Sequence, residues 1–121
     1  MAIKIYAYAG CGTCKNALKY LDAKKRKYEN VPIVEQPPTV SELEAMLGYL
    51  KARGQTFKNL FNTSGEQYRA LKIGERIKAG MTEQDAIELL SKNGKLIKRP
   101  FLLTAKGGAT GFQAETRDEL V

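Results

Sequence analysis

Apolar and polar residues alternate over residues 3–8, and this period of two predicts a β-strand. A helix is expected next, beginning near two cysteines and running into the basic residues around position 26. Its buried side would include Ala17 and Leu21, which are four positions apart. A short second strand is predicted over residues 31–34, where Pro32 indicates an edge strand or the start of a strand.

The middle of the chain has the spacing of helices. Thr39 and Glu42 match a capping box, and the helix that follows is expected to end at Gly54. A short apolar turn is predicted over residues 57–61. Thr63 or Ser64 is then expected to cap a helix that carries Tyr68 and Leu71.

Thr82 is expected to cap one more helix, which the Asn93-Gly94 pair would end. After it, residues 100–103 predict a buried strand. A turn at residues 106–108 and a return strand over residues 109–112 complete a predicted hairpin. The final residues, 115–120, are expected to form one or two helical turns.

This order of elements predicts an α/β protein with a thioredoxin-like fold. The initial strand–helix–strand unit needs a right-handed crossover and hence a parallel pair, while the hairpin adds antiparallel strands. We therefore expect a mixed four-stranded sheet with flanking helices and an inserted helical subdomain. The whole chain, residues 1–121, would form a single domain, with its core at about 1–38 and 95–121 and the insertion at about 39–94.

Composition narrows the protein class. The chain has 121 residues, 43% hydrophobic and 27% charged, which is ordinary for one globular domain. No apolar run approaches the roughly 20 residues that span a bilayer. Residues 1–4 lack the features of a secretory signal. We expect a cytoplasmic monomer without membrane contact.

The formal net charge is +7, but the basic residues are spread out. The one tight run, residues 24–27, has a simple explanation, because cations at a helix C-terminus complement the helix dipole. We therefore expect no direct nucleic-acid binding, while an anionic substrate is compatible with the charge.

The only two cysteines, Cys11 and Cys14, form a CxxC motif. A zinc site needs about four ligands, and two thiols in a chain without histidine predict no metal. The alternatives are a redox pair and two unreactive thiols. Redox chemistry is favoured because a strand-to-helix junction stabilises a thiolate and a spacing of three brings the sulfurs within reach. Cys11 is then the attacking thiolate and Cys14 the resolving thiol, and the helix N-terminus is also suited to bind an oxyanion or glutathione.

Arg99-Pro100 stands at the start of a predicted strand. In thioredoxin-like folds a cis-proline faces the CxxC motif, so Pro100 is a candidate for a cis peptide bond. Arg99 would then hold an anion or stabilise the Cys11 thiolate. The alternative is a solvated arginine beside a strand.

Several motifs, in order along nearly the whole chain, resemble the arsenate reductase ArsC / Spx family: "CGTCKNAL", "PPTVSEL", "LFNTSGEQYRAL", "LIKRPFLL" and a closing "GF". The resemblance implies a thioredoxin-like fold with a helical insertion. It makes Cys11 the thiolate that attacks arsenic, supported by residues of the surrounding C-G-T-x-basic-Asn context, namely Gly12, Thr13, Lys15 and Asn16. It implies no bound cofactor, with electrons supplied by glutathione, glutaredoxin or thioredoxin.

The chain departs from the arsenate reductases in its anion site. Of the three arginines that those enzymes use, only Arg99 matches, while Asn62 and Lys106 stand at or near the other two positions. The "Y-x-Y-x-x-C-x-T-C" opening is closer to the CxxC-bearing branch. That branch contains Spx-like regulators, which bind the C-terminal domain of the RNA polymerase α subunit under control of a disulfide switch. The sequence thus predicts an arsenate-reductase-like thiol oxidoreductase, with a redox-switched regulator as the alternative.

Overall fold

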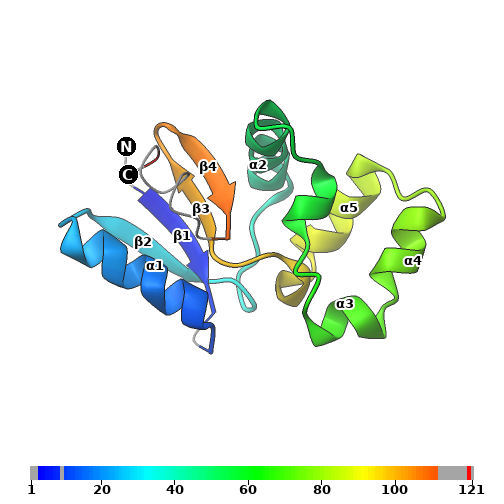
Figure 1. The fold of residues 1–121 in the computed structure, drawn as a ribbon, viewed down its shortest axis with the longest axis horizontal. Helices are drawn as coiled ribbons and strands as arrows, with labels where there is room; N and C mark the ends of the chain where they lie inside the picture. The colour runs from blue at the N-terminus through cyan, green and yellow to red at the C-terminus, as the bar shows by residue number, and fades with distance from the viewer. Residues whose placement is uncertain (1–2, 9, 112–119, 121) are drawn as a thin grey trace.

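The computed structural model describes residues 3–8, 10–111 and 120, and its described part contains one four-stranded sheet (Figure 1). The strand order is β2-β1-β3-β4, with β1 and β2 parallel and the other two pairs antiparallel. This confirms the predicted mixed sheet and thioredoxin-like layout. In chain order the elements are β1 (Ile3–Ala7), α1 (Gly12–Ala23), β2 (Tyr28–Pro32), α2 (Val40–Ala52), the 3-10 helix η1 (Phe57–Leu60), α3 (Glu66–Ala70), α4 (Ile73–Lys78), α5 (Glu83–Ser91), the 3-10 helix η2 (Gly94–Leu96), β3 (Phe101–Thr104) and β4 (Gly107–Thr110).

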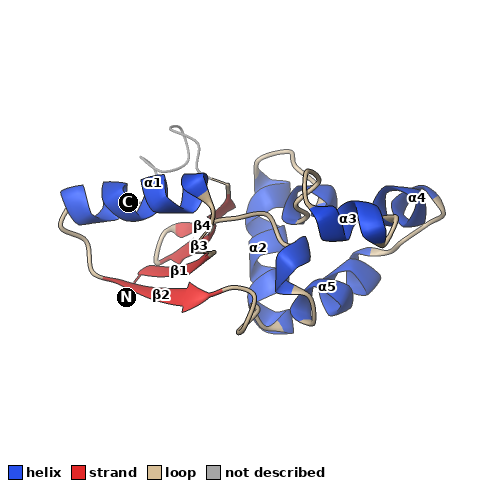
Figure 2. Ribbon diagram, turned by 90° about the horizontal axis from the view of Figure 1, so that it is seen from below, coloured by secondary structure: helices blue, strands red, loops and turns tan. Residues whose placement is uncertain are grey.

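Successive residues of β1 contribute to different hydrophobic clusters, because side chains alternate across a strand. Ile3 and Ile5 belong to a cluster with Ala17 and Leu21 of α1. Tyr6 belongs to the second cluster, which includes residues of α2 and α5. Figure 2 shows α1 over one face of the sheet, and α2 to α5 gathered next to the sheet. The sheet therefore lies between two hydrophobic clusters of unequal size.

Helix α2 joins the helical part of the chain to the sheet. A Cβ added to Gly108 of β4 would lie 3.0 Å from both Met46 and Tyr49, so this helix approaches the strand closely. Lys4 and Tyr6 of β1 also reach Glu42 in the first turn of α2, at 3.0 and 2.6 Å. Helix α2 therefore packs against the sheet and also against the other helices of residues 40–96, which we call the helical block.

Two predicted helix starts and one predicted helix end agree with the structure. Thr39 and Glu42 form the reciprocal bonds of a capping box at the start of α2. Thr82 forms a second box with Asp85 at the start of α5. Gly54 follows the end of α2 with a φ of +79°, a left-handed conformation that glycine adopts without steric cost.

The second strand was predicted in the wrong place. β2 covers Tyr28–Pro32 rather than residues 31–34, and it pairs in parallel with β1. It is an edge strand, so Glu29 and Asn30 are exposed and the apolar pattern fades there. Pro32 is its last residue, where a missing backbone N–H does not interrupt the ladder. Ile33 lies past the strand yet is fully buried, which explains the misplaced prediction.

Three other expectations need correction. Helix α3 begins after Gly65, without the side-chain cap expected from Thr63 or Ser64. Helix α4 was not predicted, because only two of its six positions carry apolar residues that are buried or partly buried. Helix α1 ends at Ala23, earlier than expected, and Lys25 takes a left-handed φ of 56° just after it.

The C-terminal hairpin is tighter than predicted, because β4 begins at Gly107, inside the predicted turn. Its register, Thr104 opposite Gly107, leaves a two-residue turn. The end of the predicted return strand and the helical turns expected over residues 115–120 fall outside the described residues, except for buried Leu120.

No helix in the part of the chain that the structure describes has the length and apolar character needed to cross a bilayer.

Candidate active site

Cys11 is the N-cap of α1. Its φ and ψ of −96° and 117° are extended, and its N–H donates to the Tyr8 carbonyl oxygen at 3.0 Å, closing the turn after β1. The Cys14 backbone N–H donates to the Cys11 Sγ at 3.3 Å. A sulfur thus occupies the position that an oxygen takes in an ordinary N-cap, facing the free N–H groups and positive dipole end of the helix.

The two thiols differ in accessibility. Cys14 is 1% exposed and belongs to the buried surface of α1, whereas Cys11 is partly exposed. Both are free thiols in this structure. An incoming reagent therefore reaches the Cys11 sulfur more readily than the Cys14 sulfur.

The two thiols also differ in acidity. Burial alone would raise the pKa of Cys11, but hydrogen bonds from Cys14, the charge of Arg99 and the Thr13 N–H together lower this pKa below its ordinary value. For Cys14, burial and the hydrogen bond to Cys11 raise the pKa to about 12. The pair therefore ionises first at Cys11, with Cys14 holding its proton as a donor to the Cys11 thiolate.

Arg99 reaches this site from the other end of the chain, immediately before β3. The Arg99-Pro100 peptide bond is cis. The Arg99 guanidinium lies over the Tyr8 ring, with its central carbon 4.7 Å from the ring centroid, a cation–π contact. Its charge favours the thiolate forms of both cysteines. Tyr8 contacts the site twice, because its backbone carbonyl closes the Cys11 turn and its ring lies under Arg99.

A cavity of about 310 Å³ lies beside Arg99 and Tyr8. Two cations, Arg99 and Lys95, line it together with one carboxylate, Glu66. The rest of the lining comes from Tyr8, Asn62, Gly65 and Gln67. Cys11 is not among the lining residues, so Arg99 and Tyr8 connect the cavity to the thiol.

Four predicted anion-binding residues lie apart from this cavity. Gly12, Thr13, Lys15 and Asn16 are all exposed on the first turns of α1, and none lines the cavity. Among them, the Thr13 backbone N–H contributes to lowering the Cys11 pKa. The structure thus brings Cys11, Cys14, Thr13 and Arg99 together and leaves the side chain of Lys15 at the surface.

The two positions at which arsenate reductases carry the other arginines lie in different places in this structure. Asn62 lines the cavity with Arg99, whereas Lys106 is exposed in the β3–β4 turn and does not line it. Sequence reasoning missed Lys95, Tyr8 and Glu66 as parts of this site. The only local signal was the position of Lys95, four residues before Arg99.

These features define a class, that of thiol proteins on a thioredoxin-like fold with a CxxC motif at a helix N-terminus and a cis-proline before an adjacent strand. The chain matches the ArsC family over residues 6–120 and belongs to that family.

Among its relatives, the protein YusI of Bacillus subtilis is 38% identical over 98% of both chains. The crystal structure of an ArsC family related protein from Bacteroides fragilis has a TM-score of 0.89 at 38% identity, covering 100% of this chain and 98% of the other. The regulatory protein MgsR of Bacillus subtilis is 29% identical over 91% of this chain and 82% of its own. An arsenate reductase of Rhizobium meliloti is 26% identical over 88% and 72%.

Proposed function

We propose that this protein is an arsenate-reductase-like thiol oxidoreductase that uses Cys11 and Cys14 as its redox pair. The observation that carries the proposal is the placement of the two thiols: the partly exposed Cys11 sulfur caps α1 and accepts the Cys14 N–H at 3.3 Å, whereas the Cys14 thiol is buried behind it. A partly exposed thiol with a lowered pKa suits the attacking role. A buried thiol that keeps its proton until the first sulfur has reacted suits the resolving role.

The reaction balances with the residues of the site. The Cys11 thiolate attacks a substrate disulfide, forms a mixed disulfide and releases one substrate thiol. Cys14 then loses its proton and attacks the Cys11 sulfur, which releases the second substrate thiol and leaves a Cys11–Cys14 disulfide. With arsenate as substrate, the Cys11 thiolate forms a bond to arsenic(V) and one arsenate oxygen leaves as water after protonation. Attack by Cys14 on the Cys11 sulfur then breaks the S–As bond and expels arsenite with the electron pair. A thiol donor (glutathione, glutaredoxin or thioredoxin) restores the two thiols.

The cavity bears on the choice of substrate. Charge-assisted bonds to an oxyanion are strong, and two of the arginines that arsenate reductases use are absent here. Lys95 and Arg99 give the cavity two cations, but the Glu66 carboxylate opposes a dianion. We therefore place disulfide substrates ahead of arsenate, within the same two-thiol chemistry and in a reducing compartment such as the cytoplasm.

The deciding assay is NADPH oxidation coupled either to glutathione with glutaredoxin or to thioredoxin with its reductase. Each arm is run with arsenate, with a small disulfide and with neither. We expect turnover that requires Cys11, so Cys11→Ser is inactive, while Cys14→Ser accumulates a mixed disulfide seen by mass spectrometry. Full activity in Cys11→Ser together with complete loss in Cys14→Ser would reverse the assigned roles.

A second candidate function is a redox-switched regulator that binds the C-terminal domain of the RNA polymerase α subunit. It is supported by the similarity to MgsR and by the incomplete set of anion-site arginines. Gly54, near the position of a glycine implicated in that contact in Spx-like regulators, is exposed at the end of α2. Capture of this polymerase domain that changes on oxidation of Cys11 and Cys14, without turnover in either coupled assay, would favour this function over the first.

A further inference from the structure

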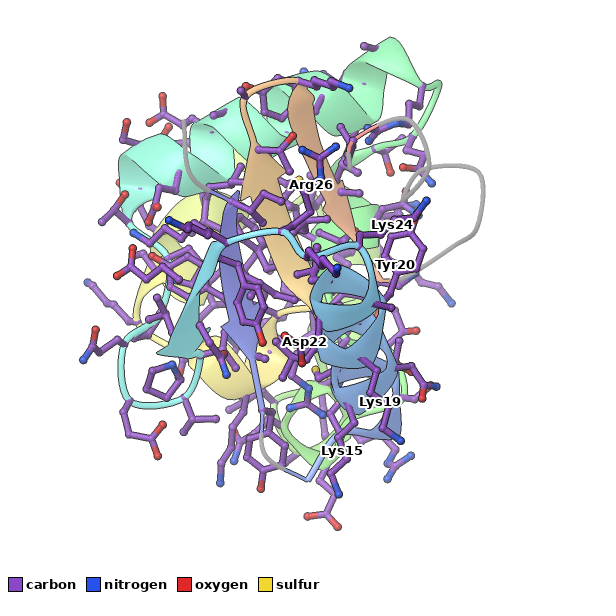
Figure 3. All side chains as sticks on the ribbon, turned by 90° about the vertical axis from the view of Figure 1, so that its left-hand side faces the viewer. Lys15, Lys19, Tyr20, Asp22, Lys24 and Arg26 are labelled. Carbon is purple, nitrogen blue, oxygen red and sulfur yellow. The ribbon has the colours of Figure 1, made fainter. Side chains whose placement is uncertain are left out.

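Helix α1 and the loop after it carry most of the net charge of the protein. Residues 15–27 include six basic side chains and one acidic one, a net charge of +5 out of +7 for the whole chain. The basic residues are all exposed, and we call them the basic face: Lys15, Lys19, Lys24, Lys25, Arg26 and Lys27. Figure 3 shows Lys15, Lys19 and Lys24 following one another along α1 from the cysteine end.

Two of these charges, on Lys15 and Lys19, do not stabilise the helix that carries them. Cations near the end of α1 complement its dipole, but Lys15 lies four residues after the N-cap, where a cation is unfavourable. Lys15 and Lys19 are four residues apart, so their like charges repel. Neither forms an ion pair with any residue that the structure describes. Lys25 also holds a left-handed φ of 56°, where glycine is usual.

The acidic residue within the basic face is already engaged. Asp22 accepts a hydrogen bond from the Tyr28 hydroxyl at 2.9 Å, and Figure 3 shows it on the side of α1 toward β2. Lys24 lies over the Tyr20 ring, with its Nζ 5.6 Å from the centroid. Lys15 and Lys19 thus cost the helix stability and have no ion-pair partner among the residues that the structure describes, which indicates a role for their charge outside the chain.

We propose that the basic face docks an acidic surface of the protein dithiol that reduces the Cys11–Cys14 disulfide, an inference that rests on the proposed function. The donor thiolate must attack Cys11, since Cys14 is 1% exposed. Cys11 caps the same helix that carries Lys15 and Lys19, so a protein positioned over Cys11 lies against α1. An acidic surface there pairs with the charges of Lys15 and Lys19 and raises the rate of encounter.

The electron balance of the docked step is complete. One donor thiolate attacks the Cys11 sulfur, and Cys14 leaves as a thiolate and takes a proton, consistent with its high pKa. The second donor thiolate attacks the first donor sulfur and releases Cys11 as a thiolate. The donor dithiol becomes a disulfide, and this protein regains two thiols.

A protein is favoured over a nucleic acid because residues 15–27 follow directly on the redox thiols and include the carboxylate of Asp22. A carboxylate in that place opposes a phosphate backbone, whereas a protein surface can present a hydroxyl or ammonium to it. Binding of nucleic acid to the basic face would contradict this assignment.

The test compares two double variants of equal charge change. Lys19→Glu with Lys24→Glu alters the basic face, and Lys78→Glu with Lys92→Glu alters exposed positions in the helical block. The oxidised form of each is reduced by a thioredoxin of net negative charge and, separately, by dithiothreitol, at low and high KCl. Binding to a DNA duplex of about 20 base pairs, long enough to span the basic face, is measured in parallel.

We expect the basic-face variant to lose about tenfold or more in its second-order rate with thioredoxin at low salt, because steering contributes about 10- to 1000-fold. The loss should shrink at high salt. Reduction by dithiothreitol should be unchanged, and the helical-block variant should match the original protein. An unchanged thioredoxin rate, or an equal loss with dithiothreitol, overturns the proposal.

Other results separate the docking proposal from the proposed function. Reduction by dithiothreitol but not by the acidic thioredoxin overturns docking and leaves the oxidoreductase chemistry standing. DNA binding that disappears in the basic-face variant, with an unchanged thioredoxin rate, assigns the face to nucleic acid and also overturns docking. Failure to form a Cys11–Cys14 disulfide overturns both.

Discussion

Neutralising Arg99 tests whether its charge controls the reactivity of Cys11. Burial opposes the lowered pKa of Cys11, and the hydrogen bonds from Cys14 outweigh the Arg99 charge among the groups that lower it. Opposite charges near a protein surface interact by up to about 4 kcal/mol at 4 Å, and less when solvent screens them. Because Arg99 is partly exposed and its charge is delocalised, we assign it about 1 kcal/mol.

An energy of about 1 kcal/mol corresponds to about a fivefold change in thiolate population wherever Cys11 is mostly protonated. Arg99→Gln should therefore lower the rate of alkylation by iodoacetamide about fivefold in that pH range. Cys14→Ala removes the larger hydrogen-bond contribution and should lower it further. Because Cys14 ionises only near pH 12, thiolate absorbance well below that pH follows Cys11 alone in the original protein.

The matched control is Lys95→Gln, which removes the other cation of the same cavity, whereas the cation that lowers the Cys11 pKa is Arg99. Its alkylation profile should overlie that of the original protein. An Arg99→Gln profile that also overlies it would refute the reasoning, since the guanidinium would then contribute nothing to the thiolate. An equal effect of Lys95→Gln would show that the net charge of the cavity acts instead of Arg99.

Two stability predictions concern contacts away from the thiols. Gly94→Ala should destabilise the fold by about 3 kcal/mol or more in urea unfolding, because the new Cβ would overlap the backbone carbonyl of Ile33. The control Gly48→Ala places its Cβ in open space on α2 and should be neutral or stabilising. Equal effects of the two substitutions would contradict this packing. Burial opposes ionisation of Glu42, but hydrogen bonds led by the one from Tyr6 outweigh it and lower the Glu42 pKa. The stability that the Glu42 carboxylate contributes is therefore present above its unfolded-state pKa and is lost as the pH falls through its folded-state pKa. Glu42→Gln should thus cost about 1–3 kcal/mol at neutral pH and much less in acid below the folded pKa, and a pH-independent cost would exclude an electrostatic origin.

Some of the fold could be predicted from local chemistry. The capping boxes at Thr39 and Thr82 depend on residues three positions apart, so the sequence contains the whole interaction. The position of β2 depends instead on its pairing with β1, and an exposed edge strand carries little apolar pattern. Ile33 is fully buried although it lies after the strand, so its apolar side chain led to a predicted strand that extends past the true end.

The candidate site also has features that depend on neighbouring residues and features that depend on distant ones. The N-cap role of Cys11 follows from its place between a strand and a helix. The contact of Arg99 with Tyr8, and the cavity that Lys95 and Glu66 share with them, require the chain to return from the helical block to the sheet. The spacing of residues in the sequence does not encode that return, which is why Tyr8, Lys95 and Glu66 were missed while the thiols and Arg99 were predicted.

Arg99 acts on Cys11 from the opposite end of the chain, and this separation makes the thiol a reporter of assembly. A partly folded chain with α1 formed would have the helix N–H groups in place but not the guanidinium. Its Cys11 would be less acidic, and hence slower to react, than in the finished protein. Cys11 would then reach its full nucleophilicity only after β3 has joined the sheet and brought Arg99 beside it.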